Sequence, residues 1–192
     1  MYEVLNVNKS LPTAQIKWNL QYNFSEEIWK NIYKFPFQKP INTTLQWFQI
    51  RINHRILANR YFLHKINIKD SPLCLYCSQQ ETISHMLWSC PKTQSILNEL
   101  KTWLFHSNPF DISEETFLFN IGNELTSVQL YILLETKFYI FNTKHVEAPL
   151  SIIHLKNKLK RTFKILESLA IKNNNIENFK IEWNPYYNIL SQ

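Results

Sequence analysis

Four side chains of the types that bind metal ions lie within seventeen residues of this sequence: Cys74, Cys77, His85 and Cys90. Their spacing is C-x2-C-x7-H-x4-C. Two cysteines separated by two residues suit a tight turn whose thiolates converge on one ion, and a later histidine and cysteine complete the tetrahedral set that zinc favours. Because four protein ligands leave no position for an activated water, the spacing predicts one structural Zn²⁺. The alternative is three buried, reduced cysteines beside a hydrogen-bonded histidine.

The residues between His85 and Cys90 must bring these two side chains together. On a continuous α-helix they would lie about 140° apart around the axis, too far for one ion. We therefore expect a short helix, capped by Thr82, that ends before Cys90. Pro91 favours this ending, because a residue before proline is displaced from the α region and proline suits the first position of the next helix.

The composition argues for a globular α-helical protein and against several other classes. A chain of 192 residues that is 45% hydrophobic has the makings of a packed core. Gly122 is the single glycine, which argues against β-rich folds and phosphate-cradling loops. The three clustered cysteines do not resemble a disulfide framework, and neither a membrane span nor a signal peptide is evident. These features predict an intracellular protein of the nucleus or cytoplasm, without a membrane partner.

Hydrophobic periodicity and capping residues predict a mainly α fold, a helical domain with a small zinc knuckle inserted between helices. The expected helices span residues 26–34, 42–57, 91–104, 127–141 and 150–170. Ser25 and Ser127 are the expected caps of two of them. In the helix at 42–57, apolar side chains recur at helical spacing and should face the core: Leu45, Phe48, Ile52 and Ile56.

The expected organisation has three parts. Residues 1–22 form an extended lead-in, residues 23–104 a helical region that contains the knuckle at 74–90, and residues 105–192 a C-terminal helical region. The segment HSNPFD is expected to be a loop. The tail is expected to be short and extended or irregular, and to pack on the body through Trp183, Tyr186 and Tyr187.

Basic side chains indicate an anionic partner. The 21 lysines and arginines exceed the 15 acidic residues, which gives a formal net charge of +6. Local clustering predicts these phosphate contacts: Arg51, Arg55, Arg60, Lys65, Lys69, Lys156, Lys160 and Lys164. Trp47 and Tyr61 could stack on unpaired bases, although an aromatic residue at helical spacing is more often part of a core.

Several short motifs occur together in this chain. A tryptophan-bearing helix with a basic turn (Trp47, Arg51, His54, Arg55) precedes the knuckle DSPLCLYC at residues 70–77. The segment ETISHML and Cys90 then follow, and the tail contains a W-N-x-Y pattern. This arrangement resembles the zinc-binding domain at the C-terminal end of reverse transcriptases from LINE-type, non-LTR retrotransposons.

The resemblance implies a segment that handles nucleic acid and holds RNA or DNA near the polymerase of a parent protein. Its partners would be RNA or DNA, bound largely without sequence preference, and the reverse transcriptase domain. No Tyr or Phe followed by x-Asp-Asp and no nuclease-type set is found, so we expect no catalysis. Two alternatives stay open: a module that docks on a polymerase or a host factor, and a relic reading frame without a role.

Overall fold

The computed structural model describes residues 12–37, 42–105, 112–122 and 125–192. Within these ranges the elements are α1 (Thr13–Tyr22), α2 (Glu26–Lys34), the 3₁₀ turn η1 (Phe35–Phe37), α3 (Thr43–Asn53), α4 (Arg60–Lys65), the π-helical turn η2 (His85–Ser89), α5 (Pro91–Leu104), α6 (Glu114–Phe119), α7 (Ser127–His145), α8 (Ile152–Lys172) and α9 (Ile176–Leu190). The predicted mainly α fold class is confirmed. The predicted loop at 106–111 lies outside the described residues, and the division of the chain near residue 104 stays a prediction.

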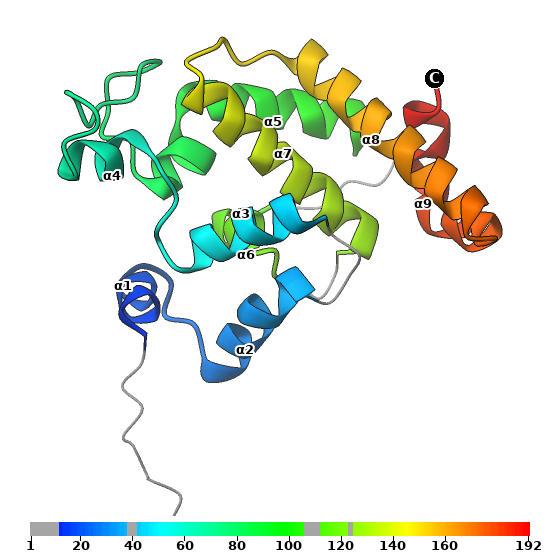
Figure 1. The fold of residues 1–192 in the computed structure, drawn as a ribbon, viewed down its shortest axis with the longest axis horizontal. Coiled ribbons are helices and arrows are strands. Elements are labelled where there is room, and N and C mark those ends of the chain that lie inside the picture. Colours follow the sequence, from blue (N-terminus) through cyan, green and yellow to red (C-terminus); the bar gives the residue numbers. More distant parts are fainter. Residues whose placement is uncertain (1–11, 38–41, 106–111, 123–124) are drawn as a thin grey trace, which may run out of the picture.

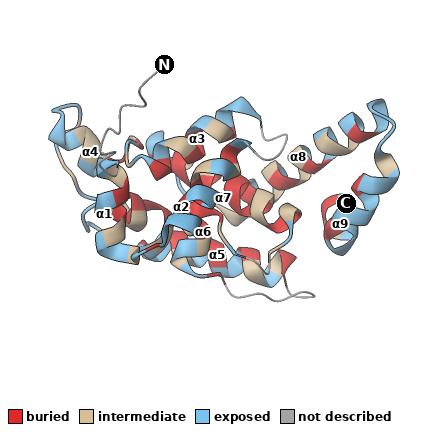
Figure 2. Ribbon diagram, turned by 90° about the horizontal axis from the view of Figure 1, so that it is seen from below, coloured by how far each residue is buried: buried red, intermediate tan, exposed pale blue. Residues whose placement is uncertain are grey.

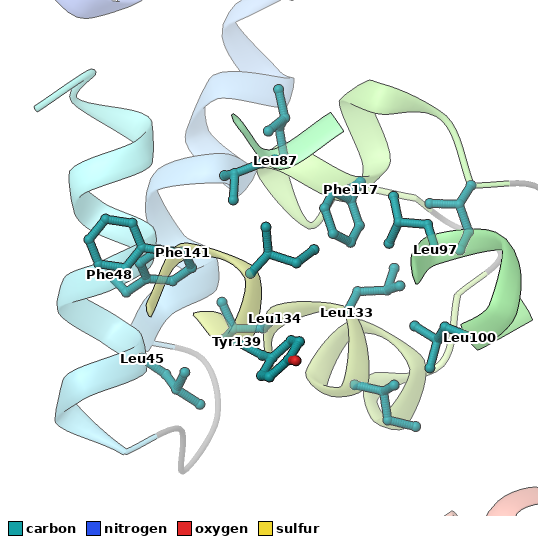
Figure 3. Close-up of a cluster of buried hydrophobic side chains, with 14 of the residues drawn as sticks. Leu45, Phe48, Leu87, Leu97, Leu100, Phe117, Leu133, Leu134, Tyr139 and Phe141 are labelled. Atoms are coloured by element: carbon teal, nitrogen blue, oxygen red, sulfur yellow. The ribbon is translucent and has the colours of Figure 1, made fainter. Parts of the chain in front are cut away.

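Helix α7 is the centre of the fold (Figure 1). It packs against α3, α6, α8 and η2. Figure 3 shows the resulting core, in which side chains such as Phe48 of α3, Leu97 of α5 and Phe117 of α6 surround Leu133 and Leu134 of α7. Figure 2 shows that buried residues concentrate around this helix, whereas the α8–α9 hairpin extends to one side. The turn η2, which begins with the candidate ligand His85, packs against α7, so the candidate zinc site is anchored on the most buried part of the molecule.

Local signals set most helix starts. Ser25 accepts a hydrogen bond from the Ile28 N–H, as expected of a cap, and the rings of Phe24 and Trp29 pack edge to face. The start of α7 differs from the expectation by one residue. Thr126, not Ser127, is the cap, because Thr126 and Gln129 form a reciprocal capping box.

The predicted helix at 42–57 ends early. Asn42 caps α3, but the helix stops at Asn53, and Arg55 adopts the left-handed conformation with φ of 56°. As a result Ile56, expected in the core, is exposed, while Leu45, Phe48 and Ile52 are buried as predicted. Arg51 and Arg55 therefore do not lie one turn apart on a continuous helix.

The lead-in at 1–22 was expected to be extended, but its described part forms the helix α1. Trp18 explains the difference. It is fully buried, and its indole N–H donates to the carbonyl groups of Ile52 and Asn53 at 3.3 and 3.1 Å. Both carbonyls lie at the C-terminal end of α3, where the helix has no further N–H groups to donate to them, and the Ile52 carbonyl also accepts a hydrogen bond from the Arg55 N–H at 2.9 Å. The helix is therefore stabilised by a distant contact, which the weak local periodicity does not reveal.

The tail also differs from the expectation, because residues 176–190 form helix α9 and not an extended element. The buried residues Phe179, Trp183, Tyr186 and Leu190 recur at helical spacing. Pro185 lies inside the helix and lacks the N–H that would bond to the carbonyl of residue 181. Ile181 is exposed to solvent, which lowers the cost of this missing bond. The prediction that the tail packs on the body through Trp183, Tyr186 and Tyr187 is confirmed, because Trp183 and Tyr187 contact the ring of Phe163 and Tyr186 contacts that of Phe105.

Candidate metal centre

The first two ligands come from a tight turn. The N–H of Cys74 donates to the Gln79 carbonyl at 2.7 Å, and the N–H of Ser78 donates to the Cys74 carbonyl at 2.9 Å. An isolated antiparallel bridge between Leu73 and Gln80 closes the turn, and Ser78 adopts a positive φ of 58°. This local geometry turns the side chains of Cys74 and Cys77 toward the same point.

The other two ligands are the first residue of the π-helical turn η2, His85, and the residue that follows the turn, Cys90. Thr82 caps the helical residues that lead into η2, since its hydroxyl oxygen accepts a hydrogen bond from the His85 N–H at 3.1 Å. The N–H of Cys90 donates to the His85 carbonyl at 3.0 Å, an i to i−5 bond that stacks residue 90 over residue 85. Cys90 itself is extended, with ψ of 127°, and Pro91 begins α5. The helix ends before Cys90 as predicted, and the widened turn is an additional device that aligns the two side chains.

The four ligand atoms lie within 4.8 Å of one another. The sulfur atoms of Cys74 and Cys90 are 3.9 Å apart, and the sulfur of Cys77 is 3.2 Å from Nε2 of His85. A tetrahedral zinc site with bonds of about 2.3 Å to sulfur and about 2.0 Å to nitrogen has edges of about 3.8 and 3.5 Å. The three cysteines are not joined by disulfides. The donor set and its dimensions therefore fit one tetrahedral ion with no open position.

A buried cation lies beside two of the sulfur atoms. Nζ of Lys144, near the C-terminal end of α7, is 4.0 Å from Sγ of Cys74 and 5.3 Å from the centre of the Tyr76 ring. The hydrogen bond with Cys74, aided by the Thr93 N–H and Lys144, lowers the pKa of Cys90 to about 3. The same pairing raises the pKa of Cys74. Without metal the pair therefore shares one proton, which stays on Cys74, while Cys90 is a thiolate, the form that binds metal.

Glu81 connects this centre to the basic helix α4. Its carboxylate accepts a hydrogen bond from the Arg60 N–H at 3.0 Å, and its carbonyl accepts one from the Tyr61 N–H at 3.3 Å. Its own N–H donates to the Pro72 carbonyl at 2.9 Å. Glu81 is buried, so these bonds are shielded from water. We call residues 74–90, which carry the four ligands, the metal segment. The position of α4 therefore depends on this segment being folded.

The end of α7 holds the centre from the other side. Glu147 accepts hydrogen bonds from Arg60 at 2.9 Å and from Lys69 at 2.8 Å, and the Tyr76 hydroxyl donates to the Ala148 carbonyl. The hydrogen bond from Lys69 is the largest cause that lowers the pKa of Glu147. Glu147 and Ala148, which follow the knuckle by some seventy positions in the sequence, thus contact residues of the knuckle and of the segment before it.

The structure separates the basic residues that the sequence suggested as nucleic-acid contacts. Arg60 and Lys69 are paired with Glu147, and Lys156 lies 5.2 Å from the Trp103 ring centre. By contrast, the side chains of Arg51, Lys65 and Lys164 are exposed, and Arg55 and Lys160 are partly exposed. Helices α4 and α8 lie at opposite ends of the molecule (Figure 1). The predicted contacts therefore form two separate groups.

Two residues of this region had no functional prediction. Lys144 lies beyond the helix predicted at 127–141, because α7 continues to His145, and Lys17 belongs to the part of the chain expected to be extended. Lys17 lies beside Arg55, whose guanidinium donates to the Lys17 carbonyl at 3.4 Å. The polar neighbours of Lys144 in the sequence, Asn142, Thr143 and His145, give no signal that this lysine is buried. The aromatic rings of Trp47 and Tyr61 are exposed, contrary to the usual tendency of aromatic residues at helical spacing.

Part of this chain is similar to a known family of protein domains. No curated protein and no solved structure matches it. Among the described residues, no helix is long and apolar enough to cross a membrane. Residues 6–96, slightly less than half of the chain, match the family model of zinc-binding in reverse transcriptase, and this range contains all four candidate ligands. This part of the chain is therefore similar to the zinc-binding domain of reverse transcriptases.

Proposed function

We propose that this chain binds one structural zinc ion through Cys74, Cys77, His85 and Cys90, and that the ordered domain binds RNA or DNA beside the polymerase of a parent reverse transcriptase of the LINE type. One observation carries the proposal: the closed cluster of ligand atoms lies in the segment that matches the reverse-transcriptase family, and Glu81 of that segment accepts a hydrogen bond from the start of the basic helix α4. A bound ion would supply a fixed cross-link between the knuckle and η2, and no catalytic step.

The chain's own residues would bind phosphates. Arg55 and Lys65 line a groove together with Thr82, which lies in the sequence between the candidate ligands Cys77 and His85, and Arg51 is exposed on α3. Lys160 and Lys164 form the second group on α8. Contacts of this kind carry little sequence information, so binding is expected to be largely nonspecific. Their strength depends on salt, because each neutralised phosphate releases counterions.

Two measurements test this proposal. Elemental analysis of the purified chain should give one zinc per molecule. Titration with a labelled oligonucleotide should show that log K falls linearly with log salt, and Arg51→Ala with Lys65→Ala should make the slope shallower by about 0.7–0.9 for each lost phosphate contact. The matched control is Lys30→Ala with Lys34→Ala, two exposed lysines of α2. A zinc-free folded chain would overturn the metal site, and salt-independent binding would overturn the phosphate contacts.

A second candidate function is docking on the polymerase of the parent protein or on a host factor. It is favoured by large apolar side chains that are exposed on the α8–α9 hairpin: Ile153, Ile165, Leu169, Ile171 and Ile181. Exposed apolar groups of this size often contact other proteins. Docking through this surface predicts association with the polymerase that persists at high salt and is lost on Ile165→Lys with Ile181→Lys.

A further inference from the structure

A groove lies between α1, α4 and residues Thr82 and Ile83 of the metal segment. It is at the end of the molecule where Figure 2 shows α1 and α4 near each other. Its volume is about 540 Å³. Thr13, Ala14 and Lys17 form one wall, α4 forms the opposite wall, and Thr82 and Ile83 close one end. Cavities of this size accept ligands the size of a small molecule, so a nucleotide fits it better than a folded partner does.

The charge of this groove suits an anion. Three cations line it, Lys17, Arg55 and Lys65, together with His54, and none of its lining residues is acidic. Arg55 is held in place, because its guanidinium stacks on Trp18 with 4.1 Å to the ring centre and donates to the Lys17 carbonyl. Lys17 and Lys65 are exposed and make no ion pair within the described part of the chain. Arg55, which is held in place, and the two exposed lysines face the same groove, so together they could contact successive phosphates of one strand.

Between these cations, the lining on and beside α4 is apolar and aromatic. Tyr61 is 41% exposed, and the neighbouring Ile56 and Ile66 are also exposed although they line the groove. A ligand that contributed only phosphate groups would leave these apolar side chains exposed to water. An unpaired base could cover it by stacking on the tyrosine ring, whereas the bases of a duplex are already stacked on one another.

We propose that this groove binds single-stranded nucleic acid, with a base against Tyr61 and the flanking phosphates on Lys17, Arg55 and Lys65. The inference rests on the proposed nucleic-acid function and adds the strandedness of the ligand and the place where it binds. RNA and DNA share this chemistry, so both are probes in the test.

The metal segment determines the shape of the groove. Thr82, whose hydroxyl oxygen accepts the hydrogen bond from the N–H of the ligand His85, is also a groove residue. Glu81 holds Arg60 and Tyr61 at the start of α4. Release of the metal would therefore loosen two walls at once, and single-strand binding should depend on zinc although no groove residue touches the ion.

The experiment is fluorescence anisotropy with the full chain and labelled RNA and DNA strands of about 12 nucleotides, a length within the range of known single-strand sites. A duplex of the same sequence is the competitor. Tyr61→Ala should weaken single-strand affinity by about 5-fold or more through lost stacking, and Tyr61→Phe should not. Trp47→Ala is the matched control, since Trp47 is an exposed aromatic residue that does not line the groove. Lys17→Ala with Lys65→Ala should reduce the salt slope by about 1.4.

Circular dichroism and zinc content of each variant establish that it is folded. A single strand that binds more tightly than the duplex and loses affinity in Tyr61→Ala, but not in Trp47→Ala, supports the inference. Equal loss in both variants, no loss in either, or tighter binding of the duplex overturns it and leaves the proposed phosphate-binding function standing. Failure of the folded wild type to bind any of the three probes overturns both.

Discussion

Helix α7 carries two buried lysines on the same face, and their surroundings differ in kind. Lys137 is fully buried and donates to Gln49 Oε1 at 2.6 Å, to the Leu118 carbonyl at 3.1 Å and to Asn120 Oδ1. Lys144, two turns later, lies 4.0 Å from Sγ of Cys74. Neither lysine pairs with a carboxylate within the described residues. One is surrounded by neutral oxygens and the other by sulfur atoms that become thiolates when metal binds.

This difference separates two uses of a buried amine. Burial without a counter-charge lowers the pKa of Lys137 well below its usual value, so its role is to satisfy the polar groups that join α3, α6 and α7. At the other site, Zn²⁺ with three thiolates and a neutral histidine would carry one net negative charge. A buried anion needs a nearby cation, and Lys144 supplies it. The first lysine stabilises the core, and the second compensates the charge of the metal centre.

Removal of the metal ligands should have the largest effect. Cys74→Ser with Cys77→Ser eliminates zinc binding, and at free zinc about a thousand times the Kd the lost stabilisation is about 4 kcal/mol. Lys144 then has a buried charge without an anion, while the surroundings of Lys137 are unchanged. Chemical denaturation with and without a chelator measures this loss. Identical unfolding curves for the variant and the wild type would contradict the structural role of the metal.

Lys137→Met should come next. The substitution leaves the side-chain oxygens of Gln49 and Asn120 without this donor, and a buried acceptor without a partner costs about 1–3 kcal/mol. Zinc content should not change, because the site lies two turns from the metal centre. If the variant loses zinc, the two lysines act as one unit and the comparison fails.

The same variant tests the pKa of Lys137. Because this pKa is lowered in the folded state, the unfolded chain binds more protons between the folded pKa and about 10.4, and the free energy of unfolding rises with pH in that window. The slope cannot exceed about 1.4 kcal/mol per pH unit for one group. Denaturation between pH 7 and 9 should show a slope that Lys137→Met reduces. If the variant and the wild type show the same slope, the pH dependence of stability arises from a group other than Lys137.

Lys144→Met should weaken zinc binding by about 10-fold, which is typical when a group next to the ligands is lost. Competition with a chelator of known affinity measures the change. Lys144→Arg keeps the charge and should retain most of the affinity, and Lys137→Met is the matched control on the same helix. Unchanged zinc affinity in Lys144→Met would show that the charge of this lysine does not support the centre.

Glu147→Gln should give the smallest effect, because the carboxylate that joins Arg60 and Lys69 is exposed to solvent. The lowered pKa of Glu147 means that its contribution is present above the unfolded pKa and is lost as the pH falls through the folded pKa. Thermal melts of variant and wild type should differ slightly at neutral pH and low salt, and this difference should shrink with added salt. A difference that grows with salt would exclude an ion-pair origin.

The sequence by itself determined what depends on neighbours a few residues apart. The caps at Ser25 and Thr82, the proline that begins α5 and the spacing of the four ligands are local features, and the structure brings those ligands together as their spacing suggested. The buried stripe of α8, which includes Leu155, Leu159 and Phe163, is likewise a matter of helical period. Such features are readable because the interacting groups share one short segment.

Only the tertiary structure decided what depends on groups far apart in the chain. Trp18 makes a helix of the lead-in by bonding to the end of α3, and the placement of Lys17 beside Arg55 creates a groove that neither segment contains alone. Glu147 pairs with Arg60 and Lys69 of the predicted contact set, and Lys144 reaches Cys74 across seventy positions. These contacts join groups that only packing around α7 brings together, so neither period nor spacing along the sequence could have revealed them.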